Sequence, residues 1–318
     1  MQNLTFSNGD KMPAFGLGTW KSAPGEVKKA VIEAIRIGYR HLDCAAIYGN
    51  ENEIGEAITQ CIQTGVVHRK ELWITSKLWN NAHQSDQVQP ALEKTLKDLA
   101  VDYLDLYLMH WPVAFKPGVA LPEDEEGYLS LREVPLTETW SAMQALKEKG
   151  LTKHIGVSNF SSKKLQELIA LGGQTPEMNQ VELHPYLQQQ SLLDFCQKHA
   201  IHVTAYSPLG SMDRPESMKK SGEPMPLENE TIKSVAAAHE VSPAQILIAW
   251  ALQRGTSVIP KSTNPKRLLE NFDAQTITLS TQEMDQIQLQ DKAERIVDGL
   301  FFTAESKGYT AASLWDEN

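Results

Sequence analysis

The sequence has little cysteine and no long apolar stretch. Its 318 residues contain 3 cysteines, Cys44, Cys61 and Cys196, and none of them forms a CxxC pair. An odd, widely spaced set fits a reducing compartment better than a disulfide framework. No run approaches the roughly 18 uncharged apolar residues of a membrane span, and the first residues lack the pattern of a secretion signal. We therefore expect a cytoplasmic protein without a membrane partner.

Positive charge is also scarce. Lys and Arg number 30 against 40 Asp and Glu, which gives a formal net charge of -10. This balance argues against nucleic acid as a partner, so any anion site has to be local. Two motifs are missing as well, since no GxGxxG follows a strand and no HExxH is present. Their absence argues against a doubly wound dinucleotide-binding sheet and against a metal-dependent barrel hydrolase, and we expect no metal site.

What the sequence does contain is a regular alternation of short apolar runs and longer stretches of helical period. The predicted strands are 16–19, 39–42, 72–76, 104–109, 154–157, 178–181, 202–206 and 257–259. Predicted helices between them include 26–37, 51–61, 88–99, 139–149, 163–171 and 191–199. Apolar strands separated by helices indicate a parallel sheet covered on its outer face, and eight such units predict an α/β fold, the (β/α)8 TIM barrel. An open doubly wound sheet is the alternative.

Helix starts carry local signals. Ser242-Pro243 with Gln245 combines a cap, a proline and a capping box, and Asn264-Pro265 repeats the cap and proline. Asn50 and Glu53 have the same capping-box spacing at the start of the 51–61 helix.

A single domain, 1–318, follows from this repeat pattern, although length alone allows about two domains. We expect a hairpin over about 3–15 with its turn at Asn8-Gly9, the barrel over about 16–290, and a C-terminal loop over about 291–318. The connections 112–135 and 210–229 are long for a compact domain, which is typical of substrate and cofactor loops.

Complementary side chains follow three neighbouring strands. Asp43 and Tyr48 come at and after the second strand, Lys77 ends the third, and His110 follows the fourth. The carboxyl ends of barrel strands meet on one face, so these four side chains should lie together. They suit reversible carbonyl reduction, in which Tyr48 protonates the carbonyl oxygen and His110 orients it. Lys77 should lower the pKa of Tyr48, and Asp43 should cancel part of that shift.

Simpler interpretations remain open at this point. Asp43 and Lys77 also fit an ordinary buried ion pair, and His110 fits a core histidine. The tryptophans at the strand ends, Trp20, Trp79 and Trp111, fit either plain packing or an apolar pocket around the reacting group.

A second cluster predicts an anion site. Lys261 and Ser262 end the eighth strand, Asn264 caps the next helix, and Arg267 lies in its first turn. Cations beside a helix N-terminus favour a phosphate, here the 2'-phosphate of NADPH, whereas an NAD ribose site more often carries an acid. A solvated basic face is the alternative. On the facing strands, Tyr206 offers a flat face for a nicotinamide ring, and its carboxamide suits Ser158, Asn159 and Gln180.

Together these segments resemble the aldo-keto reductase superfamily. The matching motifs are Gly16-Leu-Gly-Thr-Trp20, His41-Leu-Asp43, Tyr48-Gly-Asn50, Ser76-Lys77-Leu-Trp79, Leu108-Met-His110-Trp-Pro112, Ile155-Gly-Val-Ser158-Asn159-Phe, Tyr206-Ser-Pro-Leu209 and Ile259-Pro-Lys261-Ser262. The resemblance implies a (β/α)8 barrel that reduces aldehydes and ketones with NADPH, and a catalytic tetrad of Asp43, Tyr48, Lys77 and His110.

The resemblance also implies further contacts. Those to the cofactor fall on Thr19, Trp20, Asp43, Ser158, Asn159, Gln180, Tyr206, Ser207, Pro208, Leu209, Ser211, Lys261, Ser262, Asn264, Arg267, Glu270 and Asn271, and those to the substrate on Trp20, Tyr48, Trp79, His110 and Trp111.

Within the superfamily the chain is most similar to the aldehyde and aldose reductase branch, which implies a monomer acting on a small-molecule carbonyl compound. The segments 113–137 and 300–318 match no single substrate pattern. A non-catalytic NADPH-binding regulatory or structural subunit of the same fold is the alternative function.

Overall fold

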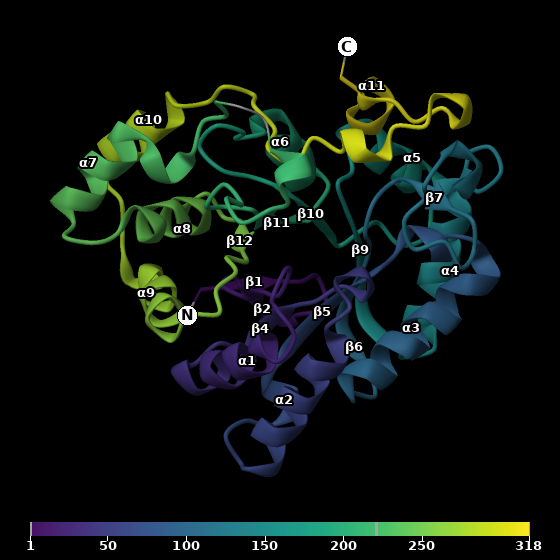
Figure 1. Cartoon of the computed structure of the whole chain (residues 1–318), viewed down its shortest axis with the longest axis horizontal. Coiled ribbons are helices and arrows are strands. Elements are labelled where there is room, and N and C mark those ends of the chain that lie inside the picture. Colours follow the sequence, from purple (N-terminus) through teal and green to yellow (C-terminus); the bar gives the residue numbers. More distant parts are fainter. Residues whose placement is uncertain (1, 220–221, 318) are drawn as a thin grey trace.

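Eight parallel strands form the centre of the computed structural model, which describes residues 2–219 and 222–317 (Figure 1). In order around the sheet they are β3 (Leu17–Gly18), β4 (His41–Asp43), β5 (Trp73–Leu78), β6 (Leu104–Met109), β9 (Thr152–Ser158), β10 (Met178–Glu182), β11 (His202–Tyr206) and β12 (Ser257–Val258). Each neighbouring pair is parallel. The predicted strands all lie in this one sheet.

The first and last strands meet, which closes the barrel. Phe15 bridges to Val258 and Gly18 to Lys261, both in parallel. At this seam a Cβ on Gly18 would lie 2.6 Å from the Ile259 carbonyl oxygen, so only glycine permits the approach. Closure confirms the (β/α)8 barrel and shows that the open doubly wound sheet is wrong.

Helices surround the strands (Figure 1). They are α1 (Glu26–Ile37), α2 (Glu51–Gln63), α3 (Ser85–Leu99), α4 (Leu136–Glu148), α5 (Ser162–Leu171), α6 (Gln190–Lys198), α7 (Glu230–Ala238), α8 (Pro243–Gln253), α9 (Pro265–Asp273), α10 (Thr281–Gln288) and α11 (Ala311–Trp315). In α1 the buried positions are Val27, Ala30, Val31, Ala34 and Ile35, one apolar stripe that packs inward. The predicted boundaries of this helix, 26–37, are confirmed.

Two of the three predicted helix caps are confirmed. Ser242 accepts from the Gln245 amide in a full capping box, and Asn264 accepts from the Arg267 amide. The capping box at Asn50 is wrong, because its side chain instead donates to the Thr19 carbonyl at 2.9 Å. There a contact to the preceding strand end replaces the local cap.

The N-terminal hairpin is confirmed and covers the amino end of the barrel. Strands β1 (Asn3–Thr5) and β2 (Lys11–Pro13) pair antiparallel around a turn in which Gly9 has φ 91. Phe6 packs on His154 and Trp73, whose ring centroids lie 4.2 and 5.2 Å away. The hairpin therefore closes the amino end of the barrel, and we call it the plug.

The two long connections and the tail lie at the other end. The 112–135 connection contains an unpredicted pair of strands, β7 (Ala114–Phe115) and β8 (Tyr128–Leu129). Part of the 210–229 connection, Lys220 and Ser221, lies outside the described residues, as do Met1 and Asn318. The tail is attached to the barrel wall by Glu182, whose two carboxylate oxygens each accept a backbone N–H at 2.7 Å, one from Ile296 and one from Val297.

Across the described ranges, no single helix is long and apolar enough to cross a membrane, although α7 and α8, bent by 93°, pass the same length and composition test as a pair.

Candidate active site

Three of the predicted catalytic side chains lie in direct contact at the carboxyl end of the strands. The Lys77 ammonium donates to Asp43 Oδ1 at 2.5 Å and to the Cys44 carbonyl at 2.8 Å, and lies 3.5 Å from Tyr48 Oη. Parallel pairing of β4 with β5 brings the first two together, and a short turn after β4, Ala46–Tyr48, returns the phenol over them. The Lys77 ammonium, held by Asp43, therefore lies next to the Tyr48 hydroxyl.

Burial controls the ionisation of this group. Burial alone would lower the pKa of Lys77, but the Asp43 carboxylate together with the neighbouring Tyr48 and Cys44 outweighs burial, and the pKa is raised. For Tyr48, burial outweighs the attraction of Lys77, and the pKa is raised above that of a free phenol. The expected lowering of the Tyr48 pKa is therefore wrong for the protein alone, since the desolvation cost exceeds the gain from a lysine whose charge Asp43 already balances. The phenol keeps its proton at neutral pH.

His110 lies directly after β6, beside the phenol. Its ring is edge-on to Tyr48 and to Trp79, with centroids 5.9 and 5.2 Å away. Burial, and next the Lys77 charge, hold the pKa of His110 well below the usual range for histidine. The imidazole is neutral at physiological pH and can donate one hydrogen bond without carrying charge.

The four residues predicted to face a nicotinamide form one hydrogen-bonded chain. Tyr206 Oη donates to Asn159 Oδ1 at 2.7 Å, and Asn159 Nδ2 donates to Ser158 Oγ and to the His110 carbonyl. Ser158 Oγ in turn donates to the Gln180 backbone. The Gln180 side-chain amide donates to Asp43 Oδ2 at 2.6 Å, so this chain of hydrogen bonds continues into the predicted catalytic group.

The predicted phosphate cluster lies on the other side of the barrel mouth. Lys261 follows β12 and pairs with Asp213 at 3.0 Å, which draws the 210–229 connection onto the cluster. Arg267, in the first turn of α9, is exposed and has no ion pair among the described residues. The exposed amides and dipole of the α9 N-terminus add to its positive potential.

Lys21, which follows Trp20, belongs to this cluster but was missed by the sequence analysis. Its ammonium lies 4.0 Å from the centroid of the Trp20 ring and, although buried, makes no hydrogen bond within the described residues. Burial lowers the pKa of Lys21 to about 8, while Asp213 opposes that shift. No motif marks a lone lysine, because only the folded 210–229 connection places Asp213 beside it.

The other predicted contacts are distributed around the same face. Thr19 Oγ1 donates to the Asp43 carbonyl at 2.8 Å, and the Trp20 ring lies 6.3 Å from that of Tyr48. Ser207 and Ser211 have left-handed backbones on either side of Pro208 and Leu209. The remaining residues are Ser262, which bonds the Asn264 backbone, Glu270, which pairs with Lys266, and Asn271, which is buried.

Comparison with known proteins supports the resemblance to aldo-keto reductases over nearly the whole chain. Residues 13–291 match the model of the aldo/keto reductase family. The chain belongs to this family. It is 53% identical to an aldo/keto reductase of Synechocystis over 100% of this chain and 97% of that protein, and 48% identical to aldo-keto reductase family 1 member A1 of Bos taurus over 92% and 90%. The solved aldose reductase of Schistosoma japonicum superposes with a TM-score of 0.87 at 40% identity, covering 95% of this chain and 96% of that one.

Membership makes the chain an oxidoreductase of carbonyl compounds. Nicotinamide cofactors and small-molecule carbonyl substrates are general to the aldo/keto reductases. The residues present suit such a cofactor, because within the described ranges the buried Lys21 ammonium has no hydrogen bond and the Arg267 guanidinium no ion pair, and phosphate oxygens would satisfy both donors.

Above the tetrad of this aldo/keto reductase lies a cluster of apolar side chains, which we call the lid cluster. It consists of Trp79, Trp111, Val113, Phe115, Tyr128, Val297, Phe302, Ala304, Tyr309 and Leu314. Trp79 connects the cluster to His110, and Phe302 contacts both Trp79 and Trp111 at centroid distances of 6.0 and 5.1 Å. The 112–135 connection and the tail therefore supply apolar side chains beside His110 of the predicted tetrad.

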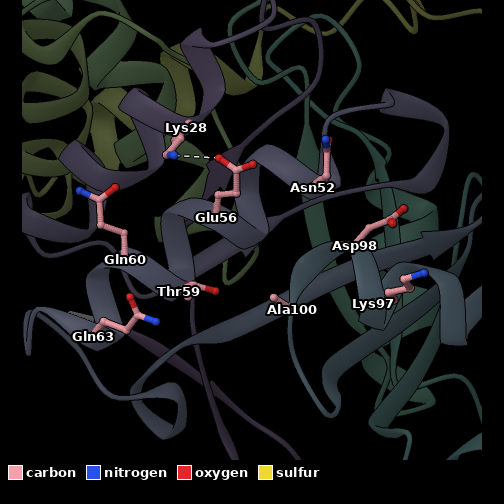
Figure 2. Close-up of a pocket in the computed structure, with 9 residues that line it drawn as sticks. All are labelled: Lys28, Asn52, Glu56, Thr59, Gln60, Gln63, Lys97, Asp98 and Ala100. Carbon is pink, nitrogen blue, oxygen red and sulfur yellow. Dashed lines mark hydrogen bonds and ion pairs between the residues drawn. The ribbon is translucent and has the colours of Figure 1, made fainter.

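A large cavity elsewhere takes no part in this site. About 580 Å³ opens on the outer surface between α1, α2 and α3, where polar side chains such as Lys28, Glu56 and Lys97 surround it (Figure 2). No member of the tetrad borders it. Elsewhere among residues 2–219 and 222–317, no three His, Cys, Asp or Glu side chains are arranged to hold a metal ion. The candidate active site is therefore identified by its titratable side chains and not by the size of a cavity.

Proposed function

We propose that this aldo/keto reductase uses NADPH to reduce aldehydes and ketones to alcohols, with Tyr48 as the proton donor. The observation that supports this most is the pairing of a protonated phenol with the Lys77 ammonium 3.5 Å away, beside the neutral imidazole of His110. A proton donor, a cation and a neutral hydrogen-bond donor are the groups that carbonyl reduction requires.

Each member of the group has a distinct task in this proposal. When bound, the reduced nicotinamide supplies the hydride. Tyr48 gives its proton to the carbonyl oxygen, and the His110 N–H orients the same oxygen. Lys77 stabilises the phenolate that Tyr48 leaves behind, because a cation close to a new anion lowers its energy. Asp43 keeps Lys77 charged and in place.

Asp43 links the catalytic group to the residues that we assign to the nicotinamide. One carboxylate oxygen binds Lys77, and the other accepts from Gln180. Neither oxygen is free to rotate toward the substrate. Gln180, Ser158, Asn159 and Tyr206 therefore hold the acid in place as well as facing the nicotinamide.

The preference for NADPH over NADH rests on the phosphate cluster. Arg267 and Lys261 flank the N-terminus of α9, where a 2'-phosphate would gain charge-assisted hydrogen bonds that NADH does not form. Lys21 and Asp213 belong to the part of the cluster that we assign to the pyrophosphate, together with Ser207, Pro208, Leu209 and Ser211. Ser262, Asn264, Glu270 and Asn271 complete the adenosine side, and Thr19 and Trp20 the nicotinamide side.

We also propose that the chain works as a single-domain monomer in the cytoplasm. The three cysteines are free and buried, which suits a reducing compartment. The substrate contacts in this proposal are Trp20, Tyr48, Trp79, His110 and Trp111, which line the mouth on the tetrad side.

The test is the initial rate of NADPH oxidation, with NADH in parallel, against aromatic, aliphatic, dicarbonyl and sugar aldehydes. Turnover that favours NADPH is the expected result. Tight NADPH binding without any turnover would contradict it and identify the chain as a non-catalytic binding subunit.

Arg267→Ala tests the phosphate assignment separately. We expect NADPH affinity to fall about 10- to 100-fold and NADH affinity to change by less than about twofold, since a charge-assisted hydrogen bond contributes about 1.5–3 kcal/mol. Dissociation constants from fluorescence titration measure both. The matched control is Arg36→Ala, an exposed arginine on α1. Equal losses for the two cofactors would refute the 2'-phosphate site.

A further inference from the structure

A buried carboxyl group outside the tetrad links the segments that carry Tyr48 and Lys77. Glu51 is the first residue of α2, three positions after Tyr48, and it is 4% exposed. Ser76 Oγ donates to Glu51 Oε1 at 2.5 Å, and Thr95 Oγ1 of α3 donates to Glu51 Oε2 at 3.0 Å. Ser76 immediately precedes Lys77 on β5. The first of these bonds therefore connects the turn that carries the phenol to the strand that carries the ammonium.

Ser76 and Lys77 extend from opposite faces of β5, because successive side chains of a strand alternate. The Lys77 ammonium lies with Asp43 and Tyr48 at the mouth of the barrel, whereas the Ser76 hydroxyl lies against α2. A displacement of α2 relative to β5 would change the distance between Lys77 and Tyr48. The bond between Ser76 and Glu51 resists that displacement.

The turn between Tyr48 and Glu51 is also fixed from the opposite side. Asn50 Nδ2 donates to the Thr19 carbonyl at 2.9 Å, and Thr19 Oγ1 donates to the Asp43 carbonyl at 2.8 Å. Asn50 thus binds the end of β3 and Glu51 binds β5, the two strands on either side of β4. Because only two residues separate the phenol from Glu51, a shift of Glu51 would be transmitted to Tyr48.

The bonds of Glu51 do not require a charge. Burial raises the pKa of Glu51 to about 7, and the hydroxyls of Ser76 and Thr95 oppose that shift. A hydroxyl group accepts as well as donates, so the carboxyl group can keep both partners whether or not it holds a proton. This separates Glu51 from Asp43, which binds Lys77 as its counter-ion.

The bond to Thr95 joins two helices that are already in close contact. A Cβ on Gly55 of α2 would lie 2.3 Å from the Asp98 carbonyl oxygen of α3, so glycine is what permits this approach of the two backbones. Loss of the Thr95 hydroxyl would leave that contact in place. The two bonds of Glu51 therefore differ in what they hold, helix to helix for Thr95 and helix to catalytic strand for Ser76.

We propose that Glu51 is a positioning residue, which through Ser76 holds the Tyr48 hydroxyl next to the Lys77 ammonium. This inference rests on the proposed function, because proton transfer from Tyr48 is the step that depends on the contact. Lys77 Nζ and Tyr48 Oη are 3.5 Å apart, already longer than an ordinary hydrogen bond of about 3 Å, so a small further displacement would break the contact. Glu51 acts through these two residues and not on the reacting atoms.

Ser76→Ala and Thr95→Val form a matched pair, since each removes one hydroxyl from the same carboxyl group. For benzaldehyde and NADPH, we expect kcat/KM to fall about five- to twentyfold in Ser76→Ala and to stay within about twofold in Thr95→Val. Dissociation constants for NADPH should stay within about twofold in both. Equal losses, or no loss in either variant, would overturn the inference. A wild-type protein that reduces no aldehyde would overturn the proposed function instead.

The pH profile of alcohol oxidation distinguishes positioning from a general loss of structure. Oxidation of benzyl alcohol with NADP+ needs the Tyr48 phenolate, which Lys77 stabilises, so the pKa on the acid side of the kcat/KM profile reports the contact between them. We expect Ser76→Ala to raise that pKa by about 0.5 or more and Thr95→Val to leave it within about 0.2. A Ser76→Ala variant with a lowered rate but an unshifted pKa would refute the positioning role.

Glu51→Gln and Glu51→Ala test whether the link or the charge matters. Glutamine has the same length, and its carbonyl oxygen and amide can each pair with one of the two hydroxyls. We expect Glu51→Gln to keep kcat/KM within about threefold of wild type and Glu51→Ala to lose at least as much as Ser76→Ala. Urea denaturation identifies the folded fraction of each variant. A folded Glu51→Gln variant as impaired as Glu51→Ala, or a folded Glu51→Ala variant with the wild-type rate, would overturn the inference.

Discussion

Both ends of the barrel bury a histidine among charged groups, yet only one end has the features of an active site. At the carboxyl end, His110 lies beside Tyr48 with its Nδ1 unbonded among the described residues. At the amino end, His154 is fully buried with Nδ1 2.9 Å from Glu177 and Nε2 3.0 Å from Asp10. The two imidazoles differ in how many of their hydrogen-bonding atoms remain available.

Both ring nitrogens of His154 already have hydrogen-bond partners, and these partners are bound further. Glu177 also accepts from Lys147 at 2.9 Å and from the Ile155 amide, and the imidazole stacks on Trp73 with centroids 5.3 Å apart. Because Asp10 belongs to the hairpin, this cluster fastens the plug to the barrel. A group of titratable residues is therefore a site only when some of its hydrogen-bonding capacity is left for a ligand.

Among the substitutions that test the difference between the two ends of the barrel, Tyr48→Phe should have the largest effect. Removing the proton donor is expected to lower kcat by about 10³-fold or more, with NADPH affinity unchanged within about twofold. Steady-state rates and fluorescence titration measure the two quantities. A variant that kept most of its rate would eliminate the proton-donor role.

Tyr107→Phe is the matched control. It removes the same atom from a fully buried tyrosine on β6 whose hydroxyl makes no hydrogen bond in the described structure. Its kcat should stay within about twofold of wild type. A loss comparable with that of Tyr48→Phe would mean that deleting any buried phenol oxygen disturbs the barrel.

His154→Leu should give the opposite pattern at the amino end. Deleting the shared partner of Asp10 and Glu177 should lower the free energy of unfolding by about 2 kcal/mol, less than for a sealed ion pair because Asp10 reaches solvent and Lys147 still binds Glu177. Urea denaturation measures this. The folded variant should keep its kcat within about twofold, and a folded but inactive variant would show that the two ends are coupled.

Lowering the pH should change the free energy of unfolding through Asp10 by the smallest amount among these predictions. The His154 hydrogen bond lowers the pKa of Asp10, so Asp10 binds fewer protons in the folded than in the unfolded chain. Its stabilisation is present at neutral pH and is lost as the pH falls below about 4. Since the Asp10 side chain is 45% exposed, we expect a contribution under about 1 kcal/mol. Urea midpoints from pH 7 to 3.5 should fall less for Asp10→Asn than for wild type, and parallel curves would contradict this.

The sequence predicted the barrel well because its strands and helices follow local patterns. Buried strands such as Leu104–Met109 are short and mostly apolar, and the Ser242 cap needs only its own neighbours. The tetrad was predicted as a set because a barrel brings strand ends together, and its contacts agree with that geometry.

Three of the failures share one cause. Asn50 turns away from its helix to bond Thr19, Lys21 meets Asp213 only through a folded connection, and the Tyr48 pKa depends on how deeply the phenol is buried. Each depends on residues distant in the chain, which sequence spacing does not encode. The β7 and β8 strands were missed because strands of two residues carry no periodicity.

The attachment of the tail through Glu182 has a consequence for how this enzyme can change. Both bonds go to backbone amides, of Ile296 and Val297, so they do not depend on which side chains the tail carries beyond that point. Any sequence that follows Val297 starts from the same position on the barrel. The barrel thus fixes where the tail begins, and the tail beyond Val297 can change in sequence without loss of these two bonds.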